Sequence, residues 1–238
     1  MTIEQEDFSW YPLGDDIGFV NVVDSMGNDL TVVNSARVSY GAYREELEEK
    51  DKKLIEYLAK HKHTSPFRHC FITFHVKCPL FVRNQWYKHI VGSNYSMGDH
   101  GSHGWNEISG RYVDIKPEFY IPYALRKQHE SSKQASVETE QELFSAELDL
   151  LEDTTFTAYE NYQELIEKGV AKEQARMILP QNMYTEFYWT ASLHAIAHFA
   201  SLRDKPDAQF EIQAYAKAIA EEAKFLFPNS FEILKENL

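Results

Sequence analysis

Residues 85–112 read QWYKHIVGSNYSMGDHGSHGWNEISGRY, and the rest of the chain is organised around this stretch. It ends in residues with the chemistry of an anion-binding site: Asn106, Glu107, Ser109, Gly110 and Arg111. A guanidinium offers a planar fork of donors to a phosphate, a serine hydroxyl adds a neutral donor, and glycine lets backbone N–H groups approach closely. Composition alone nevertheless favours the simpler interpretation of a solvated surface loop, because polar glycine-rich segments usually form loops.

The same stretch begins with Gln85, Lys88 and His89, which supply an amide and two groups able to carry positive charge. Pro79 ends the preceding strand-like run and suits the first turn of a helix. We therefore expect a helix over residues 80–89, where these three side chains lie at i, i+3 and i+4 and meet one ligand.

Length, charge and cysteine content limit the class of protein. The chain has 238 residues, 43% of them hydrophobic, which is enough for one well-buried domain. A net charge of −13 disfavours general nucleic-acid binding, which requires a broad basic surface. Two cysteines, Cys70 and Cys78, indicate a reducing compartment without disulfides. With no signal peptide and no apolar run of about 20 residues, we expect a cytoplasmic protein without a membrane partner.

Hydrophobic periodicity predicts an α+β fold, with a mixed or antiparallel sheet packed against several long helices in one domain over residues 1–238. We expect strands over residues 18–24, 70–77 and 183–192. Helices are expected over residues 45–61, 80–89, 137–168, 172–179, 192–203 and 208–227, with a short one capped by Asp29. Residues 126–136 are interpreted as a linker loop, and 113–122 as an extended piece.

Two features resemble reactive sites but favour other interpretations. His61, His63 and His69 lie close together in sequence, yet the carboxylate or cysteine partners of a zinc site are missing at ligand spacing, so we predict no metal there. Cys70 lies in a regularly alternating strand, where a thiol is usually a small packed hydrophobe. We therefore do not expect a catalytic cysteine.

The opening stretch resembles the signature of the flavin-dependent thymidylate synthases, an Arg-His-Arg followed by Ser, Asn, Ser and Arg. The matching residues here are Lys88-His89-Ile90, Ser93, Asn106, Ser109 and Arg111. The sequence departs from the pattern in having Lys88 and Ile90 for arginines, and residues 94–104 interrupt the signature as an inserted loop. Lysine keeps the charge but loses the planar fork, and isoleucine removes a cation. We favour this insertion as a lid over the folate or nicotinamide entrance; a metal site at Asp99, His100 and His103 is the alternative.

The resemblance extends through most of the chain. His63 and Ser65 match a His-x-(Thr/Ser)-Pro-Phe element, in which Arg68 replaces the usual acidic residue. Arg176 lies in an Ala-Arg-x-x-Leu-Pro motif, and Arg203 matches an arginine that reads the pyrimidine. A helix-terminal serine at 39 and a partly buried histidine face at 194 and 198 are plausible without any ligand. The resemblance instead implies flavin contacts at these positions.

By resemblance, the chain reductively methylates dUMP to dTMP with FAD, with NADPH as reductant and methylenetetrahydrofolate as carbon donor, in a homotetramer whose sites combine several subunits. The implied substrate-binding residues are Gln85, Lys88, Glu107, Ser109, Gly110, Arg111, Arg176 and Arg203. The implied flavin-binding residues are Ser39, His63, Ser65, Lys88, His89, Ile90, Asn106, His194 and His198. Ser109 and Arg203 would act on the reacting ring, Ser109 by polarising it, since no base lies beside this serine in the sequence. Two alternatives stay open: modification of another pyrimidine nucleotide such as dCMP, and a silent nucleotide-binding relative.

Overall fold

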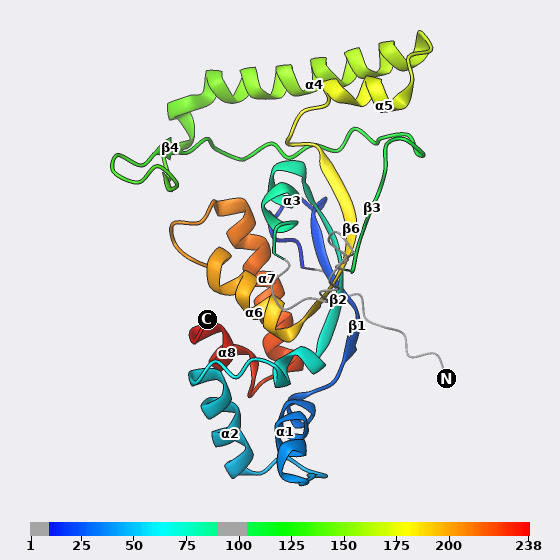
Figure 1. Ribbon diagram of the computed structural model, residues 1–238. Coiled ribbons are helices and arrows are strands. Elements are labelled where there is room, and N and C mark those ends of the chain that lie inside the picture. Colours follow the sequence, from blue (N-terminus) through cyan, green and yellow to red (C-terminus); the bar gives the residue numbers. More distant parts are fainter. Residues whose placement is uncertain (1–9, 90–103) are drawn as a thin grey trace.

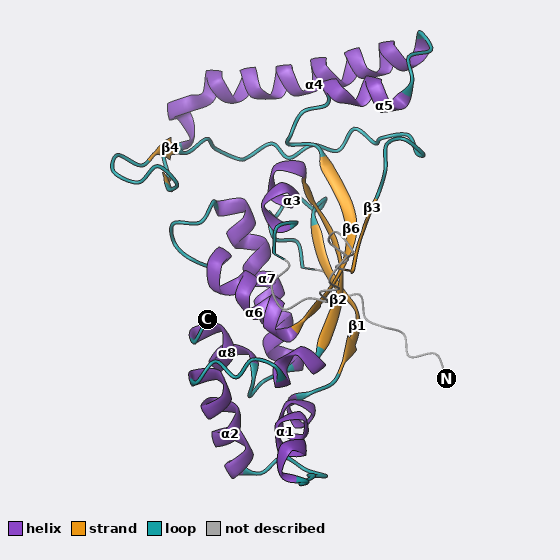
Figure 2. Ribbon diagram, viewed as in Figure 1, coloured by secondary structure: helices purple, strands orange, loops and turns teal. Residues whose placement is uncertain are grey.

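A computed structural model describes residues 10–89 and 104–238 of the chain. Its centre is a four-stranded sheet in the order β1-β2-β6-β3, in which every neighbouring pair is antiparallel. The strands are β1 (Phe19–Met26), β2 (Phe71–Pro79), β6 (Tyr184–Ser192) and β3 (Gly104–Glu107). With helices packed on this sheet, the predicted α+β fold class is confirmed (Figure 2).

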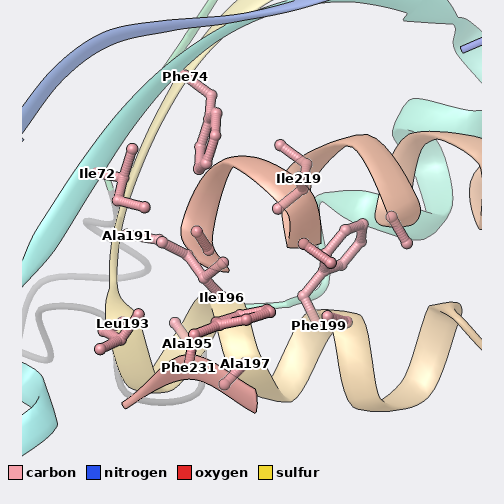
Figure 3. Close-up of a cluster of buried hydrophobic side chains, with 14 of the residues drawn as sticks. Ile72, Phe74, Ala191, Leu193, Ala195, Ile196, Ala197, Phe199, Ile219 and Phe231 are labelled. Carbon is pink, nitrogen blue, oxygen red and sulfur yellow. The ribbon is translucent and has the colours of Figure 1, made fainter. Parts of the chain in front are cut away.

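One face of the sheet forms the core because β2 alternates strictly: Ile72, Phe74 and Val76 are buried, and the residues between them are half-buried. Helices α3, α6 and α7 cover this face, and α8 packs on α6 (Figure 1). Their bounds are α3 (Leu80–Trp86), α6 (Leu193–Arg203), α7 (Phe210–Leu226) and α8 (Phe231–Glu236). Figure 3 shows Ile72 and Phe74 meeting Ile196 of α6 and Ile219 of α7 across this layer. The core therefore holds α6 directly against the central strands.

A helical pair lies beyond one end of the sheet (Figure 1). It consists of α1 (Asp29–Arg37), the 3-10 turn η1 (Val38–Tyr40) and α2 (Glu49–Lys60), and it is followed by η2 (Pro66–His69). The expected cap at Asp29 was wrong. Asn28 caps α1 through a capping box with Thr31. Asp29 is buried instead, where its carboxylate accepts hydrogen bonds from the backbone and side chain of Asn229.

A second extension carries the longest helix of the described residues past the other end of the sheet (Figure 1). Residues 126–136 contain a strand that pairs with a second one in a small hairpin, so the linker prediction was wrong there. The helix expected from residue 137 begins only at Ser145, because Val137 belongs to that hairpin. The elements of this extension are β4 (Lys127–Gln128), β5 (Ser136–Val137), η3 (Gln141–Phe144), α4 (Ser145–Glu167), α5 (Lys172–Ala175) and η4 (Arg176–Ile178). Among the described residues, no helix is long and apolar enough to cross a bilayer.

Gly18 lies where the chain enters β1 and is tightly enclosed. A Cβ at this position would lie 2.2 Å from Oη of Tyr215 and 2.9 Å from Cε1 of Tyr184. We expect Gly18→Ala to lower the free energy of unfolding by about 1–3 kcal/mol, as overpacking generally does. Urea unfolding measures this, and the double variant Gly18→Ala/Tyr215→Phe should be less affected by the alanine, because it lacks Oη. Equal stability of Gly18→Ala and the parent would contradict the expectation.

Candidate functional site

A cavity of about 940 Å³ opens at the end of the sheet nearest α5 and η4. Strand β3 pairs with β6, and Ile108 N donates to Glu186 O at 2.9 Å, so the residues after β3 run along the cavity wall. Arg176, which lies much later in the sequence, reaches the same cavity from the η4 turn. Five of the sequence-predicted substrate residues line this one cavity: Glu107, Ser109, Gly110, Arg111 and Arg176.

Charges in the cavity are partly cancelled by ion pairs. Lys77 pairs with Glu118 at 2.8 Å, and Arg83 pairs with Glu107 at 2.8 Å. Within residues 10–89 and 104–238, Arg111 and Arg176 form no ion pair with a carboxylate. Two unpaired guanidiniums in one concave site favour an anion, and a phosphate fits their fork geometry.

Glycine at position 110 lets this segment of the cavity wall pack closely against Ile115. A Cβ there would lie 2.6 Å from Cδ1 of Ile115 and 4.0 Å from Cδ of Arg176. The hydroxyl of Ser109 accepts hydrogen bonds from the backbone N–H and the Nε–H of Arg111, both at 3.4 Å. Serine and glycine therefore sit against the arginines that face the cavity.

Glu107 is held in a fixed orientation. Its Oε1 accepts from Nε of Arg83 at 2.9 Å and from Oγ1 of Thr185 at 2.7 Å, and its Oε2 accepts from Nε1 of Trp105 at 3.4 Å. Three donors on one carboxylate hold it in a single rotamer. Arg83 was not predicted as a site residue, since its partner lies 24 residues away in the sequence.

Four predicted site residues form a second group with Arg68, which was not predicted as a site residue. We call this group the imidazole cluster: His89, His194, His198, Arg68 and Arg203. Arg203 donates Nε–H to Nε2 of His89 at 3.0 Å. Arg68, on η2, donates Nε–H to Nδ1 of His194 at 3.2 Å. The rings of His89 and His198 lie 6.3 Å apart between centroids. None of the five residues lines the cavity, so the cavity residues and the imidazole cluster are separate groups in one chain.

The imidazoles of this cluster are neutral near pH 7. Burial lowers the pKa of His89 to about 4, with the charge of Arg203 as the next cause. Burial likewise lowers the pKa of His194 to about 4, followed by the charge of Arg68. Burial also lowers the pKa values of His198 and Arg203. The cluster thus offers neutral ring nitrogens beside guanidinium charges.

These depressed pKa values predict a pH dependence of stability. Because the unfolded chain binds protons at His89 and His194 below about pH 6.5, where the folded chain does not, stability should fall as the pH drops from about 6.5 to about 4. Carboxylates titrate in the same window, so the double variant His89→Gln/His194→Gln serves as the comparison. Its urea midpoint should depend less steeply on pH than that of the parent. Identical slopes would contradict the pKa assignment.

The other predicted flavin residues lie at the surface. Ser39 is exposed on η1, and His63 and Ser65 are exposed just before η2, whose residue Arg68 contacts α6. Lys88 is exposed after α3, and Asn106 is exposed on β3. Ile90, Ser93 and the inserted residues 94–103 lie outside the described residues. Gly104, which we had counted in that loop, is the first residue of β3.

The helix predicted over residues 80–89 was too long. It ends at Trp86, whose buried indole is packed among aromatic rings, and a turn from His89 N to Trp86 O follows. Gln85 therefore does not share a helix turn with His89. Its amide donates instead to the side chain of Gln209. Helix α3 and the turn after it connect the two groups, since Arg83 lines the cavity and His89 belongs to the imidazole cluster.

Neither cysteine is available as a nucleophile. Both are buried, Cys70 before β2 and Cys78 within it. Burial, followed by the charge of Asp29, raises the pKa of the Cys70 thiol to about 12, and burial raises the pKa of Cys78 as well. Among the described residues, no three His, Cys, Asp or Glu side chains gather in a way that could hold a metal ion.

Comparison with known proteins identifies the family. A family model described as thymidylate synthase complementing protein matches residues 21–229. The flavin-dependent thymidylate synthase of Thermus thermophilus is 48% identical over 224 residues, covering 94% of this chain and 77% of the relative. That of Thermosipho africanus is 44% identical over 218 residues, covering 91% and 90%.

Solved structures share the fold of this chain. The UMP/dUMP methylase PolB from Streptomyces cacaoi, bound with 5-Br UMP, superposes with a TM-score of 0.78 at 29% identity, covering 92% of this chain and 94% of that one. The same enzyme bound with 5-Br dUMP also gives a TM-score of 0.78. The family predicted from the sequence is therefore confirmed, and the chain belongs to the thymidylate synthase complementing proteins, the flavin-dependent thymidylate synthases.

Proposed function

We propose that this protein is a flavin-dependent thymidylate synthase, which methylates C5 of dUMP to give dTMP. The observation that carries the proposal is the pair of guanidiniums of Arg111 and Arg176, which face one cavity beside Ser109 and Gly110 and form no ion pair with any carboxylate of the described residues. Two guanidiniums match the phosphate of a nucleotide in charge and supply several hydrogen-bond donors to it. The names of the relatives and of the structural neighbour supply the reaction and the pyrimidine nucleotide.

In this proposal the cavity binds the phosphate and sugar of dUMP. Arg111 and Arg176 grip the phosphate, Ser109 donates its hydroxyl, and the fixed carboxylate of Glu107 accepts hydrogen bonds from the sugar or base. Arg203 stabilises the negative charge that develops on the uracil carbonyls, with Gln85 and Lys88 as further contacts. In this reaction the methylene carbon of methylenetetrahydrofolate and one hydride would form the methyl group on C5. The C5 hydrogen leaves as a proton, and the carbon donor leaves as tetrahydrofolate.

The imidazole cluster fits a flavin. It combines two guanidiniums with buried neutral imidazoles. Within the described ranges these guanidiniums form no ion pair with a carboxylate. The cluster therefore suits a ligand that has a diphosphate and a ring that becomes anionic on reduction. When bound, FAD supplies the hydride that protein side chains are unable to deliver. His89, His194 and His198 line this site, with His63, Ser65, Ser39, Lys88, Ile90 and Asn106 as the further predicted contacts. NADPH and methylenetetrahydrofolate act as co-substrates.

We also propose assembly as a homotetramer with composite sites. In one chain, the arginines of the cavity and the imidazole cluster are separate groups, and the cluster residues are absent from the cavity lining. Association of copies of this chain would let the cavity of one face the imidazole cluster of another, so that uracil and flavin meet. Light scattering of the purified protein measures the molar mass and tests this part of the proposal.

Two measurements on the purified protein test the proposed function. A visible spectrum should show bound flavin. With FAD, NADPH and methylenetetrahydrofolate, tritium should leave C5 of labelled dUMP, with UMP and dCMP assayed in parallel. UMP belongs in the panel because the structural neighbour is described as a UMP/dUMP methylase. Bound flavin without tritium release from any of the three nucleotides would contradict a synthase and favour a silent relative.

A further inference from the structure

Arg68 joins two parts of the chain that lie 126 residues apart in sequence. It lies on η2, where its Nε donates to Nδ1 of His194 on α6 at 3.2 Å and its Nη2 donates to Oγ1 of Thr64 at 3.0 Å. Arg203 makes a matching contact, with its Nε donating to Nε2 of His89 at 3.0 Å. Two guanidiniums therefore each donate to a histidine of the same cluster.

This geometry determines which ring nitrogen carries the proton. A guanidinium only donates, so the nitrogen that faces it must present a lone pair. His194 is then protonated on Nε2, and His89 on Nδ1. The depressed pKa values of both rings agree with neutral imidazoles. Each arginine thus fixes one tautomer, and the two tautomers are opposite.

The remaining N–H groups point to a ligand. His194 is 5% exposed and His89 is 7% exposed, so both rings are almost fully removed from water. In the part of the chain that the structure describes, no hydrogen bond reaches Nε2 of His194 or Nδ1 of His89, and neither Arg68 nor Arg203 pairs with a carboxylate. Among the described residues, neither nitrogen is a fully enclosed polar atom without a partner, so each N–H stays accessible to an acceptor group on a ligand.

We propose that Arg68 is a positioning residue of the flavin site. It holds His194 with the proton on Nε2, so that the cluster presents N–H donors to the ligand. These donors favour ligand groups that accept hydrogen bonds and carry negative charge. The inference rests on the proposed function, since it takes this ligand to be FAD, through its diphosphate or its reduced ring. The acidic residue usual in the family at position 68 would instead favour a protonated imidazole. Arg68 therefore favours the neutral form of the His194 imidazole, where an acidic residue would favour the protonated form.

The tautomer can be read directly in the protein without added flavin. Nitrogen-15 labelling of histidine and long-range proton–nitrogen correlation should show His194 neutral and protonated on Nε2 at pH 7, with its signals assigned by their loss in His194→Gln. In Arg68→Met the ring should become a mixture of tautomers, and Arg68→Lys, which keeps a donor and the charge, should restore part of the original pattern. Arg44→Met is the matched control, because Arg44 pairs with Glu48 outside the cluster, and it should leave the spectrum unchanged. A ring protonated on Nδ1 in the parent, or one unaffected by Arg68→Met, overturns the positioning role.

Ligand-binding measurements test whether Arg68 makes the cluster prefer ligand groups that carry negative charge and accept hydrogen bonds. Arg68→Met should weaken FAD binding by about tenfold, as expected for loss of a charged donor arrangement, and should lower the reduction potential of the bound flavin. ADP serves as a probe of the diphosphate: equal weakening of ADP and FAD assigns the effect to the phosphates, and a changed potential with unchanged ADP binding assigns it to the ring. If Arg68→Met leaves both the affinity for FAD and the reduction potential of the bound flavin unchanged, the proposed preference for anionic ligand groups is overturned. If the parent binds no flavin, the proposed function fails, while the tautomer measurement still decides the role of Arg68. Thermal unfolding of each variant confirms that it is folded.

Discussion

The double variant Arg111→Ala/Arg176→Ala is expected to bind dUMP about a thousandfold more weakly than the parent protein. Each charge-assisted hydrogen bond is worth about 1.5–3 kcal/mol, so loss of both guanidiniums removes roughly 4 kcal/mol, which corresponds to a factor of about a thousand. The single variants should each lose about ten- to a hundredfold, without strict additivity, because both arginines would hold one phosphate. Isothermal titration with dUMP at low ionic strength measures these constants.

Deoxyuridine provides the decisive comparison, since it lacks the phosphate. Its affinity should be nearly the same for the parent and the variants. Raising the salt concentration should reduce the difference in dUMP affinity between the parent and the variants, because both arginines are exposed in this structure. Arg44→Ala is a matched control, because Arg44 pairs with Glu48 at 3.1 Å and does not line the cavity. An equal loss for deoxyuridine and dUMP would show that the cavity itself had collapsed, and would refute the phosphate assignment.

Trp86→Ala should lower the free energy of unfolding by about 3–5 kcal/mol, the range found when a large aromatic is removed from a core. Trp86 is fully buried at the end of α3. It stacks on Phe199 with centroids 4.7 Å apart, and it meets Phe187 and Trp189 edge to face at 5.5 and 5.4 Å. Such aromatic pairs add to the free energy of burial.

Two further variants sharpen this stability prediction. Trp86→Phe should be affected much less, because Nε1 of Trp86 is buried and finds no acceptor among the described residues. Phe225→Ala, at a side chain that is 81% exposed, should stay within about 0.5 kcal/mol of the parent. Urea unfolding at pH 7 with unchanged m-values gives the comparison. A Trp86→Ala variant as stable as Phe225→Ala would show that the aromatic cluster does not hold α3.

The sequence predicted the central strands well, because burial of one face imposes a period of two. The alternation of Ile72, Phe74 and Val76 is enough to place β2, and the aromatic run of β6 follows the same rule. The end of α3 could not be read in this way. Helix propensity continues past Trp86, yet the helix ends there, where the indole is packed in the assembled core.

The site was predictable where one short motif supplies its residues, as for Ser109, Gly110 and Arg111, which line the cavity together. It was not predictable where partners are distant in sequence. Arg83 meets Glu107 across 24 residues, and Arg68 meets His194 across 126. Only the pairing of the strands and the docking of η2 against α6 create these contacts. The division of the predicted residues into two groups arises in the same way.

The buried thiols have a practical consequence for the chemistry this protein can withstand. Cys70 and Cys78 are the only cysteines of the chain, and both are fully enclosed with pKa values raised by burial. Alkylating reagents and mild oxidants attack thiolates that reach solvent, so in the folded state they find no target here. Storage without reductant should therefore not oxidise the thiols of the folded protein, and thiol-directed inhibitors should not modify it.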